Sequence, residues 1–163
     1  MGSSIGNLSD EEAAAFLHQI RKVARPVDRL LIGADLAKEP SVIVAAYNDP
    51  QGMTAMFNLN VLERMNRELE GDFDLDAFEH QAPYQRQRGR VEMRLVSRRN
   101  QSVRIGVAGR SFEFREGEPI WTERCRKYTE DRLGRIVRAG GFETIERWYD
   151  AKNWFGIRLL QPA

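Results

Sequence analysis

The chain has little of the chemistry that disulfide frameworks and metal sites need. It carries one cysteine and two histidines among its 163 residues. Cys125 alone can form neither an intrachain disulfide nor a multi-cysteine zinc site, and one free thiol favours a reducing, cytoplasmic setting. His18 and His80 lack the spacing of paired metal ligands. We therefore expect a cytoplasmic protein and no metal site.

Long apolar runs and a charge imbalance are also lacking. No run approaches the roughly 18 residues that a membrane-spanning helix requires, and residues 1–12 have no apolar segment of the kind found in a signal peptide. The formal net charge of +1 favours neither nucleic acid nor a membrane as a partner. With 42% hydrophobic and 30% charged residues, the chain should fold as a domain of ordinary size.

The first 36 residues have the pattern of a helix followed by a strand. Ser9 and Glu12 have the spacing of a capping box, which places acids over the positive end of the helix, and Pro26 ends it. The contiguous apolar residues 30–32 predict a strand that is buried on both faces. A helix followed by such a strand is half of a β-α-β unit, so we expect an α/β fold with a parallel sheet.

The remaining chain changes in character twice. Residues 37–70 are expected to form two helices separated by turn-forming residues at 47–52, with Gly71 as the cap that ends the second. Alternation from about residue 80 predicts antiparallel strands with turns near Asn100 and Gly109, in which Val91, Met93 and Leu95 face inward and Glu92 faces solvent. A helix over 129–139 and two paired strands should close the chain.

Four short motifs occur in the order in which one enzyme family has them. They are residues 3–8 (SSIGNL), residues 46–60 with the run Phe-Asn-Leu-Asn, residues 91–95 (VEMRL), and residues 122–128 with Thr-Glu and Lys-Tyr. Together they resemble the S-adenosylmethionine-dependent L-histidine Nα-methyltransferases of ergothioneine biosynthesis. The resemblance implies the C-terminal strands of a Rossmann-like methyltransferase sheet, over 1–36 and 129–163, and an inserted α+β substrate-recognition domain over 37–128.

The resemblance implies no catalytic side chain and five substrate-binding residues, namely Asn7, Tyr47, Met93, Glu123 and Cys125. Asn7 and Tyr47 would hold the amino-acid end of the substrate, because an amide and a phenol can donate to a carboxylate without adding charge. Glu123 would accept a hydrogen bond from the imidazole, and Met93 would pack against the substrate side chain. Cys125 stands where the family commonly has serine, a better donor, so the exact amino-acid substrate stays open.

Each of these residues also has a purely structural interpretation. Asn7 suits a turn before a helix, and Tyr47 suits a half-buried position at a helix end. Glu123 lies among cationic residues and could form a surface ion pair, while Met93 could simply be an inward strand residue. These alternatives stay open at the level of the residues alone.

The family's cofactor, S-adenosylmethionine, is implied by the resemblance, but its usual binding element is missing. That element is a strand followed by a glycine-rich turn and a helix. The cofactor-binding residues are therefore unknown, and we expect the chain to be a domain fragment, a split gene product completed by a separate N-terminal chain, or a degenerate relative. With the missing half supplied, the reaction implied is methylation of the α-amine of L-histidine to trimethylhistidine. The alternatives are a non-catalytic amino-acid-binding or regulatory remnant and a subunit of a split methyltransferase.

Seven arginines lie between Arg86 and Arg104, with Glu92 as the one acid in that span. Such a run could bind phosphates. Strand alternation explains it more simply as a solvated sheet face, and few aromatic residues are interleaved for base stacking. We therefore expect no nucleic-acid partner.

Overall fold

The structure, a computed structural model, describes residues 2–163 and divides into two compact units, each described by itself. Unit 1 comprises Met1–Glu39, Gln85–Val91 and Arg124–Ala163, and unit 2 comprises Pro40–Tyr84 and Glu92–Glu123. The domain boundaries expected from the sequence stay a prediction. Within residues 2–163, no helix is both long enough and apolar enough to cross a membrane.

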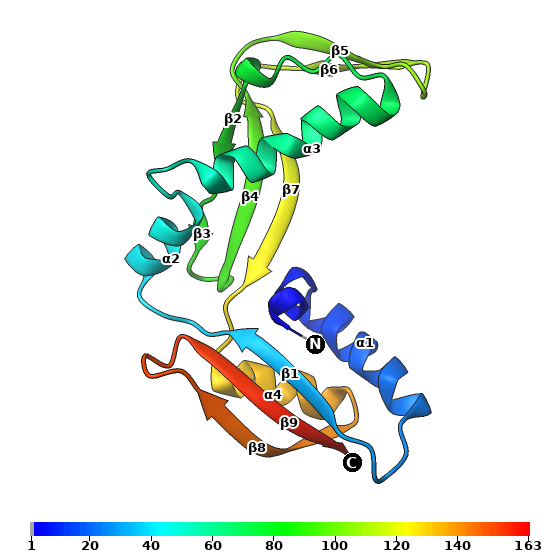
Figure 1. Cartoon of the computed structure of the whole chain (residues 1–163), viewed down its shortest axis with the longest axis vertical. Helices are drawn as coiled ribbons and strands as arrows, with labels where there is room; N and C mark the ends of the chain where they lie inside the picture. The colour runs from blue at the N-terminus through cyan, green and yellow to red at the C-terminus, as the bar shows by residue number, and fades with distance from the viewer. Residues whose placement is uncertain (1) are drawn as a thin grey trace. The chain divides into compact units, whose positions relative to one another are not determined.

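Unit 1 contains a three-stranded sheet in which β9 lies between β1 and β8 (Figure 1). Its elements are η1 (Ser3–Asn7), α1 (Asp10–Val23), β1 (Leu30–Asp35), α4 (Glu130–Ala139), β8 (Phe142–Tyr149) and β9 (Phe155–Pro162). The pairing of the last two strands is confirmed, and so is the mixed α/β class. The expected parallel sheet is wrong for these strands, because β9 returns from β8 as a hairpin and runs antiparallel to both neighbours.

The first helix forms where its local signals predict it. The Ser9 hydroxyl accepts from the Glu12 N–H, and the Glu12 carboxylate accepts from the Ser9 N–H, so the capping box is confirmed. Leu17 from α1 is fully buried in a core with Ile32. The prediction that residues 30–32 are all buried is wrong, since Leu31 is 50% exposed. Its side chain lies on the opposite side of the strand from Ile32, as strand alternation requires.

Unit 2 combines two helices with antiparallel strands. Its elements are α2 (Pro40–Tyr47), α3 (Met53–Leu69), η2 (Leu75–Ala77), β2 (Phe78–Gln81), β3 (Tyr84–Gln85), β4 (Arg90–Ser97), β5 (Gln101–Ile105), β6 (Arg110–Phe114) and β7 (Pro119–Arg126), with the ends of β3, β4 and β7 belonging to unit 1. Strand β4 pairs with β2, β3 and β7, while β5 and β6 form a hairpin. The two helices, their break and the antiparallel strands β4, β5 and β6 were predicted from the sequence, whereas β2, β3 and β7 were not.

The core of unit 2 forms between α3 and the strands. Phe73, Phe78 and Phe114 meet edge-on or tilted, with ring centroids 5.6–6.3 Å apart. Two sequence predictions fail in this unit. Glu92 is buried rather than solvent-facing, and α3 ends at Glu70 in a left-handed conformation, one residue before the expected cap.

Candidate functional site

The turn that carries Asn7 is held in place by two long-range hydrogen bonds. The Tyr128 hydroxyl donates to the Ile5 carbonyl oxygen (2.9 Å), and the Arg124 guanidinium donates to the Asn7 carbonyl oxygen (3.0 Å). Burial raises the pKa of Tyr128 to about 12, so the phenol keeps its proton and remains a donor. The backbone of Asn7 is thereby fixed, while its side chain stays exposed.

Gly6 brings this turn against the strand segment that carries Cys125. A Cβ atom added at Gly6 would lie 3.1 Å from the Arg126 carbonyl oxygen and 3.4 Å from Cys125 Sγ. A side chain at this position would push the strand away by a few tenths of an ångström, so glycine permits the close approach. Asn7 and Cys125, two of the five predicted substrate-binding residues, therefore lie on adjoining segments of unit 1.

The side chain of Lys127 is buried, and its ammonium group contacts Cys125. The Lys127 side chain is only 1% exposed, and its ammonium donates to Asp35 Oδ2 (2.5 Å) and to Cys125 Sγ (3.3 Å). Lys38 donates to the other oxygen of Asp35 (2.6 Å). The buried charge of Lys127 is thus compensated, and the sulfur of Cys125 receives a hydrogen bond that orients it. Sequence reasoning missed this arrangement, because Asp35 and Lys127 are 92 positions apart.

Tyr47, at the end of α2, is held by His80 in β2. His80 Nε2 lies 2.9 Å from the Tyr47 carbonyl oxygen, and His80 Nδ1 lies 2.9 Å from Asn58 Nδ2. A carbonyl can only accept and an amide NH₂ can only donate, so His80 donates through Nε2 and accepts at Nδ1. Asn58 is itself 1% exposed. His80, which lacks metal-ligand spacing in the sequence, therefore has a structural role, since it fixes the end of α2.

The break between α2 and α3 is ordered by Asp49. Its carboxylate accepts hydrogen bonds from the Met53 N–H (2.8 Å) and the Thr54 N–H (2.9 Å), at the start of α3. The hydroxyl of Thr54, followed by these backbone groups, lowers the pKa of Asp49 to about 2. The Tyr-Asn-Asp motif therefore has a structural role in addition to any role in binding.

Met93 and Glu123 lie in unit 2 with Tyr47. Met93 is buried in β4, and Glu123 is half-buried in β7. Beside Glu123, the Thr122 hydroxyl is buried and makes no hydrogen bond within the part of the chain that the structure describes. Asn7 and Cys125 thus lie in unit 1, and Tyr47, Met93 and Glu123 lie in unit 2.

The residues present do not fit the usual site of S-adenosylmethionine. The connections from β1 to α2 and from β7 to α4 contain no glycine, so neither forms a glycine-rich turn. Asp35, the acid at the end of β1, is already paired with two lysines. Among the described side chains, no group of three His, Cys, Asp or Glu could hold a metal ion.

The mixed α/β fold and the order of the four motifs along the chain are those expected of a methyltransferase. The family model described as histidine-specific methyltransferase, SAM-dependent, matches residues 1–162. The chain belongs to this family.

Known relatives agree with this assignment. The chain is 43% identical over 159 residues to histidine N-alpha-methyltransferase of Mycobacterium tuberculosis (strain CDC 1551 / Oshkosh), covering 98% of this chain and 50% of that protein. It is 30% identical to ergothioneine biosynthesis protein 1 of Neurospora crassa, covering 100% and 18%. A methyltransferase structure from Clostridium acetobutylicum aligns with a TM-score of 0.48 and 11% identity, covering 99% and 55%. The chain spans about half the length of the bacterial relatives that it matches.

Proposed function

We propose that this chain is the substrate-recognition half of an N-methyltransferase that methylates the α-amine of L-histidine to trimethylhistidine. The observation that carries the proposal is the family match over residues 1–162, which includes all five residues predicted to bind the substrate. The methyl donor, S-adenosylmethionine, would be bound by a second half that this chain lacks. The role of this chain is then to bind and orient the amino acid.

Two backbone segments, each held by a long-range hydrogen bond, would position the amino-acid end of histidine. The Asn7 amide and the Tyr47 phenol can donate to the substrate carboxylate and leave the α-amine uncharged and accessible. The turn of Asn7 is fixed by Tyr128, and the end of α2 is fixed by His80. Such prior ordering supports rapid methyl transfer, because the rate depends on holding the amine in line with the methyl group.

Glu123 and Cys125 would recognise the imidazole ring. Glu123 can accept a charge-assisted hydrogen bond from an imidazole N–H, which an apolar side chain cannot supply. Cys125 makes a weaker hydrogen bond than serine, so we expect histidine to be bound less tightly than by a Cys125→Ser variant.

Methyl transfer from labelled S-adenosylmethionine to L-histidine tests this proposal. The purified chain is assayed alone and mixed with the half of the Mycobacterium tuberculosis relative that lies outside the matched stretch. We expect no transfer by the chain alone and trimethylhistidine from the mixture. Absence of transfer from a mixture in which the two halves associate would contradict the proposal.

A second candidate is a non-catalytic histidine-binding remnant, which the half-length match favours. Titration calorimetry with L-histidine separates the two. Binding to the chain alone, together with no transfer in any mixture, would favour the remnant. Binding that appears only after the second half is added would favour the half-enzyme.

A further inference from the structure

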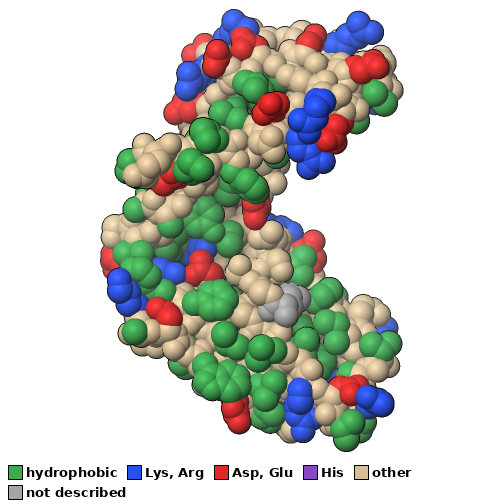
Figure 2. Space-filling model, in the orientation of Figure 1, with side chains coloured by type: hydrophobic (Ala, Val, Ile, Leu, Met, Phe, Trp, Pro, Cys, Tyr) green, Lys and Arg blue, Asp and Glu red, His purple; other side chains and the backbone are tan. Residues whose placement is uncertain are grey.

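One side of α3 exposes large apolar side chains. Met53, Met56, Phe57 and Val61 are 61%, 59%, 66% and 43% exposed, and we call these four residues the α3 patch. Hydrophobic side chains gather over α2 and the first half of α3 in Figure 2. The opposite side of the helix is buried against the core of unit 2 through Asn58 and Leu62. The α3 patch is therefore an additional apolar surface, separate from the face that holds the helix in its unit.

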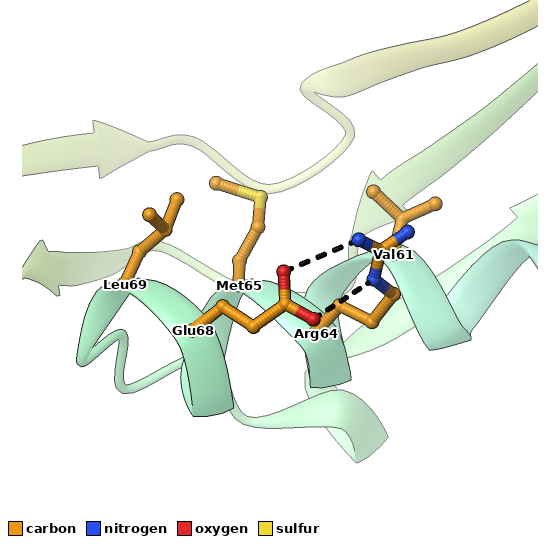
Figure 3. A pocket seen from close by; sticks show the side chains of 5 residues that line it. All are labelled: Val61, Arg64, Met65, Glu68 and Leu69. Atoms are coloured by element: carbon orange, nitrogen blue, oxygen red, sulfur yellow. Dashed lines mark hydrogen bonds and ion pairs between the residues drawn. The ribbon is translucent and has the colours of Figure 1, made fainter.

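In the second half of the helix the apolar row turns toward the core, since Met65 packs against the buried cluster of unit 2. Val61, Met65 and Leu69 point in one direction and line a hollow of about 190 Å³, at whose edge Arg64 and Glu68 form an ion pair (Figure 3). This pair is solvent-exposed, so it contributes little to stability. It does form a polar edge beside an apolar surface, the arrangement found at protein interfaces.

The spacing and chemistry of the α3 patch fit another helix. Met53, Phe57 and Val61 are four residues apart, so they form a ridge of the kind that packs into the groove of a neighbouring helix. Residues 51–62 contain no charged side chain. Methionine side chains adapt to irregular apolar partners. A contiguous uncharged apolar surface of this type is characteristic of an interaction site.

We propose that the α3 patch is the docking surface for an apolar helix of the polypeptide that supplies the cofactor-binding half. This inference rests on the proposed function, since it requires that half to exist. Two observations favour this occupant. The bacterial relatives have about as much chain again outside the matched stretch, and the described residues lack the glycine-rich turn that would hold the cofactor.

A second copy of the chain fits less well. In an antiparallel pairing of two α3 helices centred near Val61, the uncharged first half of each helix would cover Arg64 and Glu68 of the other. Covering those charges with methionine and phenylalanine carries a desolvation cost that no new partner offsets. A helix with an apolar face and no charge opposite residues 51–62 avoids this cost.

Binding of the full chain to the half of the Mycobacterium tuberculosis relative that lies outside the matched stretch tests the proposal, with neither histidine nor cofactor present. The patch variant is Met56→Lys combined with Phe57→Glu, both at exposed positions. The matched control is Glu63→Lys, an exposed charge change elsewhere on the same helix. We expect the wild type and the control to bind equally and the patch variant to bind at least tenfold more weakly.

Oxidative footprinting of the wild type gives a second readout that needs no variant. Met53 and Met56 should oxidise readily in the chain alone and become protected in the mixture, while buried Met93 should oxidise slowly in both. Equal binding by the patch variant, no binding by the wild type, or protection that arises from self-association would each overturn the proposal. Docking without methyl transfer would instead refute the proposed function and leave this inference standing.

Discussion

At the residue scale, Gly6 is a position of the candidate site where one added methyl group should strain the packing. A Cβ there meets the Arg126 carbonyl oxygen at 3.1 Å, whereas a Cβ at Gly2, one turn earlier, meets nothing within 4 Å. We therefore expect Gly6→Ala to lower the free energy of unfolding by about 1–3 kcal/mol, as overpacking against backbone does, and Gly2→Ala to leave it unchanged. Urea denaturation measures both. Equal midpoints for the two variants would show that the turn is not packed against this strand.

Replacing Lys127 should also lower the free energy of unfolding. Lys127→Met would leave Asp35 with Lys38 alone and Cys125 without its donor. We expect the variant to lose about 1–3 kcal/mol of stability at neutral pH, less than for a fully buried pair because Asp35 keeps one partner. Lys22→Met, at an exposed position on α1, is the control and should stay within about 0.5 kcal/mol of wild type in chemical denaturation. A similar loss in both would rule out a special role for Lys127.

At the element scale, Asp49 at the start of α3 should make the free energy of unfolding depend on pH in the acidic range. The pKa of Asp49 is lowered to about 2 by hydrogen bonds from Thr54 and Met53. Because the folded-state pKa lies below the unfolded one, the stabilisation is fully present above about pH 4 and is lost as the pH falls toward 2. Asp49→Asn removes this titration. We expect its melting temperature to change less than that of wild type between pH 5 and pH 2, and parallel pH profiles would contradict this.

The elements that the sequence predicts well are those whose signals are local. The capping box at Ser9 and the turn formers at 47–52 act within a few residues, and the helices begin and end beside them. Strand pairing depends on distant partners, so the parallel sheet was predicted incorrectly. The short strands β2 and β3 were missed, since they are four and two residues long and surround Pro83.

The candidate site shows the same division between local and distant signals. The five substrate-binding residues were proposed because their motifs resemble a family, and neither spacing nor periodicity singles them out. The contacts that support them join distant positions, such as His80 with Tyr47, 33 residues apart, and Lys127 with Asp35. No local pattern encodes such pairs, so only the folded structure reveals them.

At the scale of the whole molecule, two separate cores form in a chain that spans half of its bacterial relatives. Each unit has its own buried cluster, so this half can be ordered while still lacking a cofactor site. Its contribution to methyl transfer would then be the selection and orientation of histidine. Among the five proposed residues, Glu123 would be the one whose charge distinguishes an imidazole from other side chains.

The central claim is therefore tested by replacing that charge. The measurement is kcat/KM for L-histidine, in the mixture of this chain with the complementary half, for wild type and Glu123→Gln. Loss of one charge-assisted hydrogen bond should lower kcat/KM by about 10- to 100-fold, corresponding to about 1.5–3 kcal/mol. An unchanged kcat/KM for histidine in the Glu123→Gln variant would contradict the account.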